Sequence, residues 1–109
     1  MSKAVKLNSG ETINHIPSSD VAAGDVILQG NLFGIALTAI PSGRLGSLAI
    51  SGIFRITKLS TDNVTVGAVL YWDNTNKRVT LTAGGNTRIG LAVAASPSGQ
   101  ATADVLINR

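Results

Sequence analysis

A length of 109 residues predicts one domain with a core of its own. The sequence contains no cysteine, which excludes disulfides and thiolate metal sites, and it has no apolar run long enough for a membrane-spanning helix. Charged residues make up 14 % of the chain, against about 25 % in typical globular domains. A surface so poor in charge suits a protein that other subunits partly cover.

The formal net charge of +3 does not by itself predict a nucleic-acid-binding protein. The Lys and Arg residues are scattered, and the adjacent pair Lys77-Arg78 lies in an expected hairpin turn. Basic residues do not alternate with aromatic ones, as they do where bases are stacked. We therefore expect neither nucleic acid nor a membrane as a partner.

Residues 1–16 are expected to form an N-terminal arm or hairpin, followed by a single β domain at 17–109. Residues 3–7 and 12–16 both alternate polar and apolar side chains, and Asn8-Ser-Gly10 between them is a turn signal. Pro17 ends the second extended piece, because proline cannot donate a hydrogen bond to a strand ladder.

A short pattern occurs three times: an aliphatic residue, two spacers, a glycine, one residue and another aliphatic residue. The three copies are Val21-Ala-Ala-Gly24-Asp-Val26, Ile40-Pro-Ser-Gly43-Arg-Leu45 and Val64-Thr-Val-Gly67-Ala-Val69. In each copy the glycine stands where the chain must turn before an extended run, a place that favours positive φ. We predict that Gly24, Gly43 and Gly67 are structural turn glycines at strand entrances.

The remaining predicted strands are short and separated by turn signals about 8 to 12 residues apart. Gly30-Asn31 predicts a tight hairpin between residues 26–29 and 32–37. Ser51-Gly52 interrupts an apolar run and predicts a bulge or bend that helps a sheet curl, which favours a barrel. Further strands are expected at 68–72, 78–82, 89–94 and 103–107. The sequence thus predicts an all-β fold, a compact small barrel or sandwich of short strands with little or no helix.

Sites for chemistry are not evident. His15 is the only histidine, and with Ser9 and Asp20 it does not form a recognisable nucleophile context. The carboxylates do not cluster at metal-ligand spacing, and the chain has no Gly-Lys pair for a phosphate-binding loop. We expect no enzyme activity, no cofactor, no metal and no small-molecule substrate.

The neighbouring aromatic residues Tyr71 and Trp72 leave two interpretations open. Because successive strand residues point to opposite faces, one is expected in the core and the other at an interface or partly exposed. Alternatively, Tyr71, Trp72 and Asp73 form a face that stacks on sugars, as in a β-rich host-surface or glycan-binding module.

The order and spacing of several phrases resemble the small cement or decoration proteins of tailed-phage capsids. The phrases run almost end to end: Ala22-Ala-Gly-Asp-Val26, Gly34-Ile-Ala36, Ile40-Pro-Ser-Gly43 with Leu45-Gly46, Gly52-Ile-Phe-Arg-Ile56, Gly67-Ala-Val-Leu-Tyr-Trp-Asp73 and Ile89-Gly90-Leu-Ala-Val-Ala94. The resemblance implies a structural protein of a phage or prophage virion. It would form a homotrimer on the outside of the head that binds the major capsid protein, similar in role to the decoration protein of lambdoid phages.

On this resemblance, the N-terminal arm is the expected capsid-contacting element, because an alternating segment can add a strand to a sheet edge. The candidate contact residues are Lys3, Val5, Leu7, Ile13, His15 and Ile16. The arm could equally be a hairpin that belongs to the domain itself. The N-terminal residues lack the apolar stretch of a signal peptide, so we expect synthesis in the cytoplasm of a host bacterium and a final place on the outer surface of the virion capsid.

Overall fold

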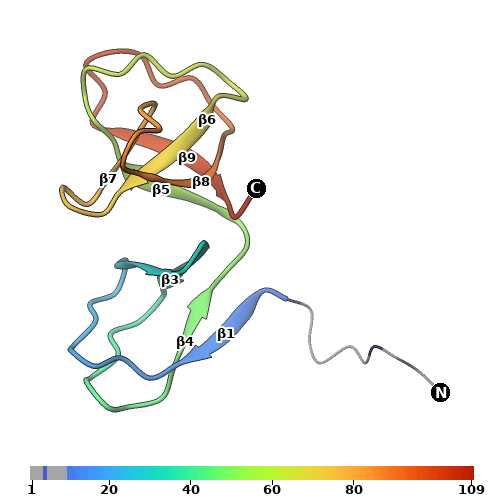
Figure 1. The fold of residues 1–109 in the computed structure, drawn as a ribbon, viewed down its shortest axis with the longest axis vertical. Helices are drawn as coiled ribbons and strands as arrows, with labels where there is room; N and C mark the ends of the chain where they lie inside the picture. Colours follow the sequence, from blue (N-terminus) through green and yellow to red (C-terminus); the bar gives the residue numbers. More distant parts are fainter. Residues whose placement is uncertain (1–3, 5–9) are drawn as a thin grey trace.

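The structure, a computed structural model, describes residue 4 and residues 10–109. The described residues form nine β-strands and no helix (Figure 1). The strands are β1 (Thr12–His15), β2 (Val26–Gln29), β3 (Leu32–Ala36), β4 (Gly46–Ala49), β5 (Ile53–Thr57), β6 (Val69–Asp73), β7 (Arg78–Thr80), β8 (Thr87–Ala92) and β9 (Thr102–Ile107). The all-β prediction is confirmed.

Two antiparallel sheets make up the fold, one in the lower and one in the upper half of Figure 1. The first has the strand order β1-β4-β3-β2 and the second the order β5-β9-β8-β6-β7. Neither sheet closes on itself, so the architecture is the sandwich and not the barrel. The chain crosses between the sheets at residues 50–52, where Gly52 has φ 118°. The sequence predicted that Ser51-Gly52 bends a single strand, but these residues instead separate β4 from β5.

The principal core lies between the two sheets. Phe33, Ile35 and Ala49 of the first sheet pack against the second sheet and its loops, which contribute Ile56, Val64, Leu70, Trp72, Val79, Ile89, Ala92, Ala103, Val105 and Ile107. A smaller second core, made of Val21, Ala36, Ile40 and Leu48, lies on the other face of the first sheet. Each fully buried aliphatic side chain contributes about 1.5 to 3 kcal/mol to folding, so the principal core dominates the stability.

The two sheets repeat one topology. β1, β4, β3 and β2 of the first sheet correspond in order to β5, β9, β8 and β6 of the second. Hydrogen bonds between the turns and the strands also correspond: Gly24 N donates to Ala36 O over 2.6 Å, and Gly67 N donates to Ala92 O over 2.7 Å. We call residues 12–49 the first unit and residues 53–107 the second unit.

The sequence carries the same repeat. Residues 34–43 and 90–99 both read Gly-x-Ala-x-x-Ala-x-Pro-Ser-Gly, and each segment runs from the third strand of its sheet order into the following loop. The units differ mainly in one connection. Gly30-Asn31 joins β2 to β3, whereas residues 74–86, including β7, join β6 to β8.

Of the three predicted turn glycines, two are equivalent to each other in this repeat, and the third is equivalent to a glycine outside the predicted pattern. Gly24 (φ 89°) and Gly67 (φ 84°) occupy equivalent places, shortly before β2 and β6. Gly43 (φ 76°) lies before β4, and its equivalent is Gly99 (φ 98°) before β9, which lies outside the threefold pattern. These backbone angles strain any residue that carries a Cβ atom.

Candidate functional site

The structure separates the predicted capsid-contact residues. Lys3, Val5 and Leu7 lie outside the described residues. Ile13 pairs with Leu48 in the ladder between β1 and β4 and packs against the second core. Ile16 follows β1 directly and is 63 % exposed.

His15 has a structural contact. Its Nδ1 atom forms a hydrogen bond of 2.8 Å with Nε2 of Gln29. β1 and β2 are the two outer strands of the first sheet, so this bond connects opposite edges and shows that the sheet is strongly curled. This bond engages one of the two ring nitrogens, and Ser9, the suggested partner of His15 in a catalytic arrangement, lies outside the described residues.

A groove of about 500 Å³ opens between the two sheets. Apolar side chains from both units form part of its lining, including Val26, Ile35, Phe54 and Trp72, and Asp25 is among its polar residues. Asp25 Oδ2 already accepts a hydrogen bond from Ala22 N over 2.9 Å. The other charged residues of the lining are Asp20, Arg55 and Lys77. Each also has a partner: Asp20 Oδ1 accepts from Ser42 N, Arg55 pairs with Asp104, and Lys77 donates to Asn74 Oδ1. The groove is therefore a seam of the sandwich whose charged side chains are held in structural contacts.

The contacts of the aromatic pair favour packing over sugar binding. Trp72 is 3 % exposed and belongs to the principal core, and its indole N–H donates to Asn74 Oδ1 over 3.1 Å. Tyr71, its neighbour on β6, is half-buried outside that core. Trp72 is therefore not an exposed stacking platform.

Asp73 is also occupied. Its carboxylate accepts hydrogen bonds from the Asn76 side-chain amide over 2.8 Å and from the backbone amides of Thr75 and Asn76. These bonds, led by that of the Asn76 side chain, lower the pKa of Asp73. Trp72 and Asp73, two of the three residues of the suggested glycan-binding face, are thus committed to the core and to a turn.

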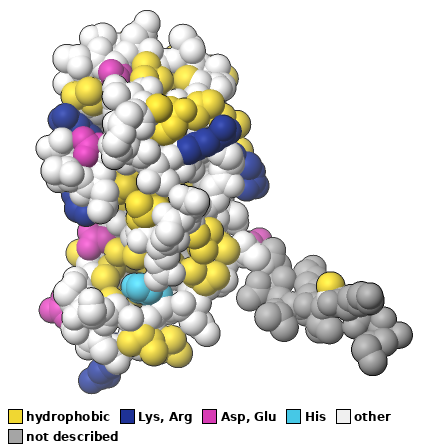
Figure 2. All heavy atoms as spheres, viewed as in Figure 1, with side chains coloured by type: hydrophobic (Ala, Val, Ile, Leu, Met, Phe, Trp, Pro, Cys, Tyr) yellow, Lys and Arg dark blue, Asp and Glu magenta, His cyan; other side chains and the backbone are white. Residues whose placement is uncertain are grey.

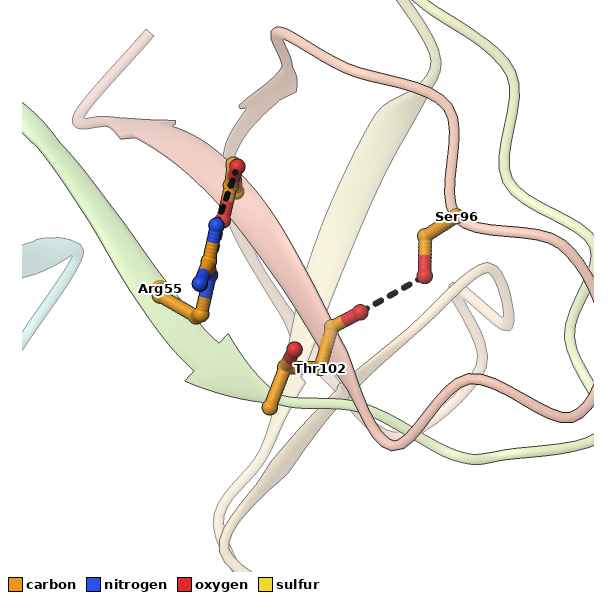
Figure 3. Close-up of polar contacts among 4 residues, drawn as sticks. Arg55, Ser96 and Thr102 are labelled. Carbon is orange, nitrogen blue, oxygen red and sulfur yellow. Dashed lines mark hydrogen bonds and ion pairs between the residues drawn. The ribbon is translucent and has the colours of Figure 1, made fainter.

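An ion pair crosses the outer face of the second sheet (Figure 3). Arg55 Nε on β5 lies 2.8 Å from Asp104 Oδ1 on the paired strand β9. The hydrogen bond and charge of Asp104 raise the pKa of Arg55, and the same bond lowers the pKa of Asp104. In the same region, Ser96 Oγ donates to Thr102 O over 2.6 Å. An exposed pair of this kind adds little stability.

Sequence reasoning missed a buried lysine. Lys58 is 3 % exposed, and its ammonium donates to three backbone carbonyls, those of Asp62, Ser96 and Pro97, over 2.7 to 3.0 Å. These carbonyls belong to the two loops that lead into β6 and β9. A lone lysine after a strand carries no sequence signal for such a clamp.

The described residues hold no group of three or more His, Cys, Asp or Glu side chains placed to bind a metal ion. Nor does the described part of the chain include a helix long and apolar enough to cross a bilayer. Hydrophobic side chains reach the surface in both halves of the molecule, and the charged groups between them are scattered (Figure 2). The described residues thus combine exposed apolar side chains with structural clamps.

The comparison with protein families identifies the family of this chain. Residues 7–107 match the phage cement protein family, so the chain belongs to it. The resemblance seen in the sequence is confirmed, and the protein is a structural protein of the phage capsid.

Other comparisons add one structure. The N base of head fiber gp8.5 in bacteriophage phi29 is similar to this chain, with a TM-score of 0.48. The two chains share 15 % identity, and the similarity covers 89 % of this chain and 92 % of that one. A comparison with curated proteins finds no match.

Proposed function

We propose that the protein is a homotrimeric decoration protein that binds the outer surface of the phage head and stabilises the lattice of the major capsid protein. The observation that carries this proposal is the family match, which extends over residues 7–107 and so includes nearly the whole chain. The low charge content and the exposed apolar side chains are compatible with a surface that packs on other subunits.

The mechanism is stabilisation by selective binding. A protein that binds the mature shell, but not its precursor or the free capsid subunits, stabilises that shell by mass action. Three subunits joined in one trimer would each contribute a modest contact, and their combined binding would be far tighter than that of one subunit. No catalytic step is involved.

The N-terminal segment, residues 1–16, is the proposed capsid-contacting element. It includes β1, a terminal strand of the first sheet, and Ile16 just after β1 is exposed. An extended segment can add a strand to the edge of a partner's sheet. Ile13 and His15 have contacts within the first unit, so Lys3, Val5, Leu7 and Ile16 are the stronger candidates.

Truncation tests the segment. Removing residues 2–16 would also remove β1, so the informative variant lacks only residues 2–9 and retains every described strand. We expect this variant to keep the oligomeric state of the full chain but to lose binding to expanded capsids that lack the decoration protein, measured by co-sedimentation. Ile16→Ser is the matched point variant and should weaken binding while the chain stays folded.

Unchanged capsid binding by the truncated chain would contradict the segment hypothesis. The wider proposal has its own test. Addition of the full chain should raise the temperature at which expanded capsids disassemble and should leave precursor shells unaffected. If the full-length protein does not bind expanded capsids at all, the decoration function is excluded.

A further inference from the structure

An apolar stripe crosses one face of the second sheet. Cross-strand partners in the ladders place Ile53 opposite Leu106, Leu106 opposite Leu91, and Leu91 opposite Val69. Directly opposed residues of antiparallel strands share a face of the sheet. The stripe, defined as these four side chains, therefore spans β5, β9, β8 and β6 without a polar interruption.

The stripe faces away from the core. Its members alternate along their strands with Phe54, Val105, Ala92 and Leu70, all of which lie in or pack against the principal core. Ile53 is 61 % exposed, and Leu106, Leu91 and Val69 are half-buried. The ion pair of Arg55 and Asp104 lies on the same face, beside the stripe.

The repeat supplies a reference for this surface. The equivalent row of the first unit runs through Thr12, Ala49, Ile35 and Val26, which are opposed in the same way across β1, β4, β3 and β2. Ile35 and Ala49 are buried in the principal core, and Val26 packs against it. In the first unit, this row is thus covered by a unit of the same topology.

We propose that the stripe is the surface through which one copy of this chain contacts the next in the trimer. This inference takes the trimer from the proposed function and adds the surface through which the copies contact one another. Within the chain, the row of the first unit does not meet its own equivalent. It shares the principal core with Leu70, Val105 and Ala92, which point to the opposite face of the second sheet.

Within every copy, the face that covers the row of the first unit is itself buried in the principal core. The stripe of one copy must therefore meet a different surface of its neighbour, which makes the contact heterologous. Such contacts close into rings when the rotation allows, and a trimer is such a ring. A stripe that met its own equivalent would instead produce a twofold dimer. Burial of the stripe also removes an apolar sheet face that would otherwise favour aggregation.

Charged substitutions test the surface. Ile53→Asp places a carboxylate on the most exposed stripe position, and Ile53→Ser is the milder form. Leu45→Asp is the matched control, because Leu45 is 65 % exposed and lies outside the stripe. The measurement is mass by light scattering after size-exclusion chromatography, with far-ultraviolet circular dichroism to verify folding.

We expect the wild type and Leu45→Asp to have three times the chain mass of 11.1 kDa, and folded Ile53→Asp to fall threefold to the single-chain mass. Ile53→Ser should shift the dissociation of the trimer to higher protein concentration. If Ile53→Asp is folded and fully trimeric, the stripe is not the contact between copies, and the decoration function is unaffected. The same conclusion holds if this trimeric variant no longer binds capsids, because the stripe would then be a surface that faces the shell. A monomeric or dimeric wild type overturns both the stripe and the trimer.

Discussion

At the scale of single residues, Asn108 joins the two units. Its side-chain amide donates to Phe33 O over 2.8 Å and to Ile50 O over 2.7 Å, and its Oδ1 accepts from Phe33 N over 2.9 Å. The residue has φ 60°, a left-handed conformation that asparagine tolerates better than most residues. The Asn108 side chain, next to the end of β9, thus satisfies two backbone groups of Phe33 in β3 and the carbonyl of Ile50, just after β4.

Replacement of Asn108 should therefore cost stability. Asn108→Ala removes three partly buried hydrogen bonds and leaves their backbone partners unpaired, so we expect a loss of about 2 to 4 kcal/mol in the free energy of unfolding. Urea denaturation followed by Trp72 fluorescence measures it. Asn86→Ala is the control, since the Asn86 side chain donates an exposed bond to Thr82 O. Equal losses for the two variants would contradict the clamp.

The Lys58 clamp gives a second residue-scale prediction. Lys58→Met keeps most of the side-chain volume but leaves the carbonyls of Asp62, Ser96 and Pro97 without their donor. Because unpaired buried polar groups are costly, we expect a loss of about 1 to 3 kcal/mol in the free energy of unfolding. Lys77→Met, at an exposed lysine bonded to Asn74 Oδ1, should change it by about 0.5 kcal/mol or less. A Lys58→Met protein as stable as the wild type in urea denaturation would show that the buried charge is not needed.

Asp73 predicts a dependence on acid. Hydrogen bonds from Asn76 lower its pKa in the folded state below the ordinary value of 3.8. Its contribution is therefore complete above pH values near 3.8 and is lost as the pH falls through the lower folded pKa. We expect Asp73→Asn to be less stable than the wild type at neutral pH and to approach it in strong acid, measured by urea denaturation across this range. A stability difference independent of pH would rule out this linkage.

At the scale of elements, β6 and β8 pair with an irregularity. The register shifts between Leu70 and Tyr71, so that Leu70 opposes Gly90 and Tyr71 opposes Arg88. Ile89 is the extra residue of this bulge, and it is buried in the principal core. A Cβ atom at Gly90 would overlap the backbone carbonyl of Leu106 on β9. The bulge and the glycine together let β8 pack between β6 and β9.

Substitution at Gly90 should disrupt this arrangement. Gly90→Ala forces β8 and β9 apart, because the obstructing atoms are backbone and cannot rotate away. We expect a loss of about 3 kcal/mol in the free energy of unfolding. Gly84→Ala is the matched control, since a Cβ there meets no atom within 4 Å. A tolerated Gly90→Ala, measured by thermal unfolding, would show that the strands can separate at little cost.

Local sequence signals predicted the elements that depend on local turns. Gly30-Asn31 correctly predicted the hairpin of β2 and β3, because a two-residue turn fixes its register. The repeat of the two units was missed, because residues 74–86 in the second unit have no counterpart in the first and shift the spacing between matching phrases. The Ser51-Gly52 link was misread, since a bend within one strand and a crossing between two sheets have the same sequence signal.

The candidate contact surfaces were less accessible to sequence reasoning. Ile16 could be named because it ends an alternating segment. The stripe could not, because it joins side chains from four strands whose pairing is set by long-range contacts. The same holds for Asn108, whose partners Phe33 and Ile50 lie far away in sequence.

At the scale of the whole molecule, one core is shared by both units. Phe33 and Ile35 of the first unit and Val105 and Ile107 of the second belong to the same buried cluster. The second core is small by comparison. Neither unit can therefore bury its apolar surface alone.

We accordingly expect the protein to unfold in a single transition. Trp72 lies in the second unit and reports on it by fluorescence, whereas far-ultraviolet circular dichroism reports on both sheets. The two probes should give the same denaturant midpoint, the usual criterion for two-state unfolding. A fluorescence midpoint at a higher urea concentration would show that the first unit unfolds separately.

The repeat of the two units also indicates how such a chain is put together. A single unit on its own has an apolar row on one face and can cover it only by meeting another molecule. When two units are joined end to end, one of these contacts becomes intramolecular, and the connecting chain keeps the local concentration of the partner high. The stripe, which is the equivalent row of the second unit, has no such tethered partner among the described residues. At that face the fused chain therefore still needs a covering surface, as each unit does by itself.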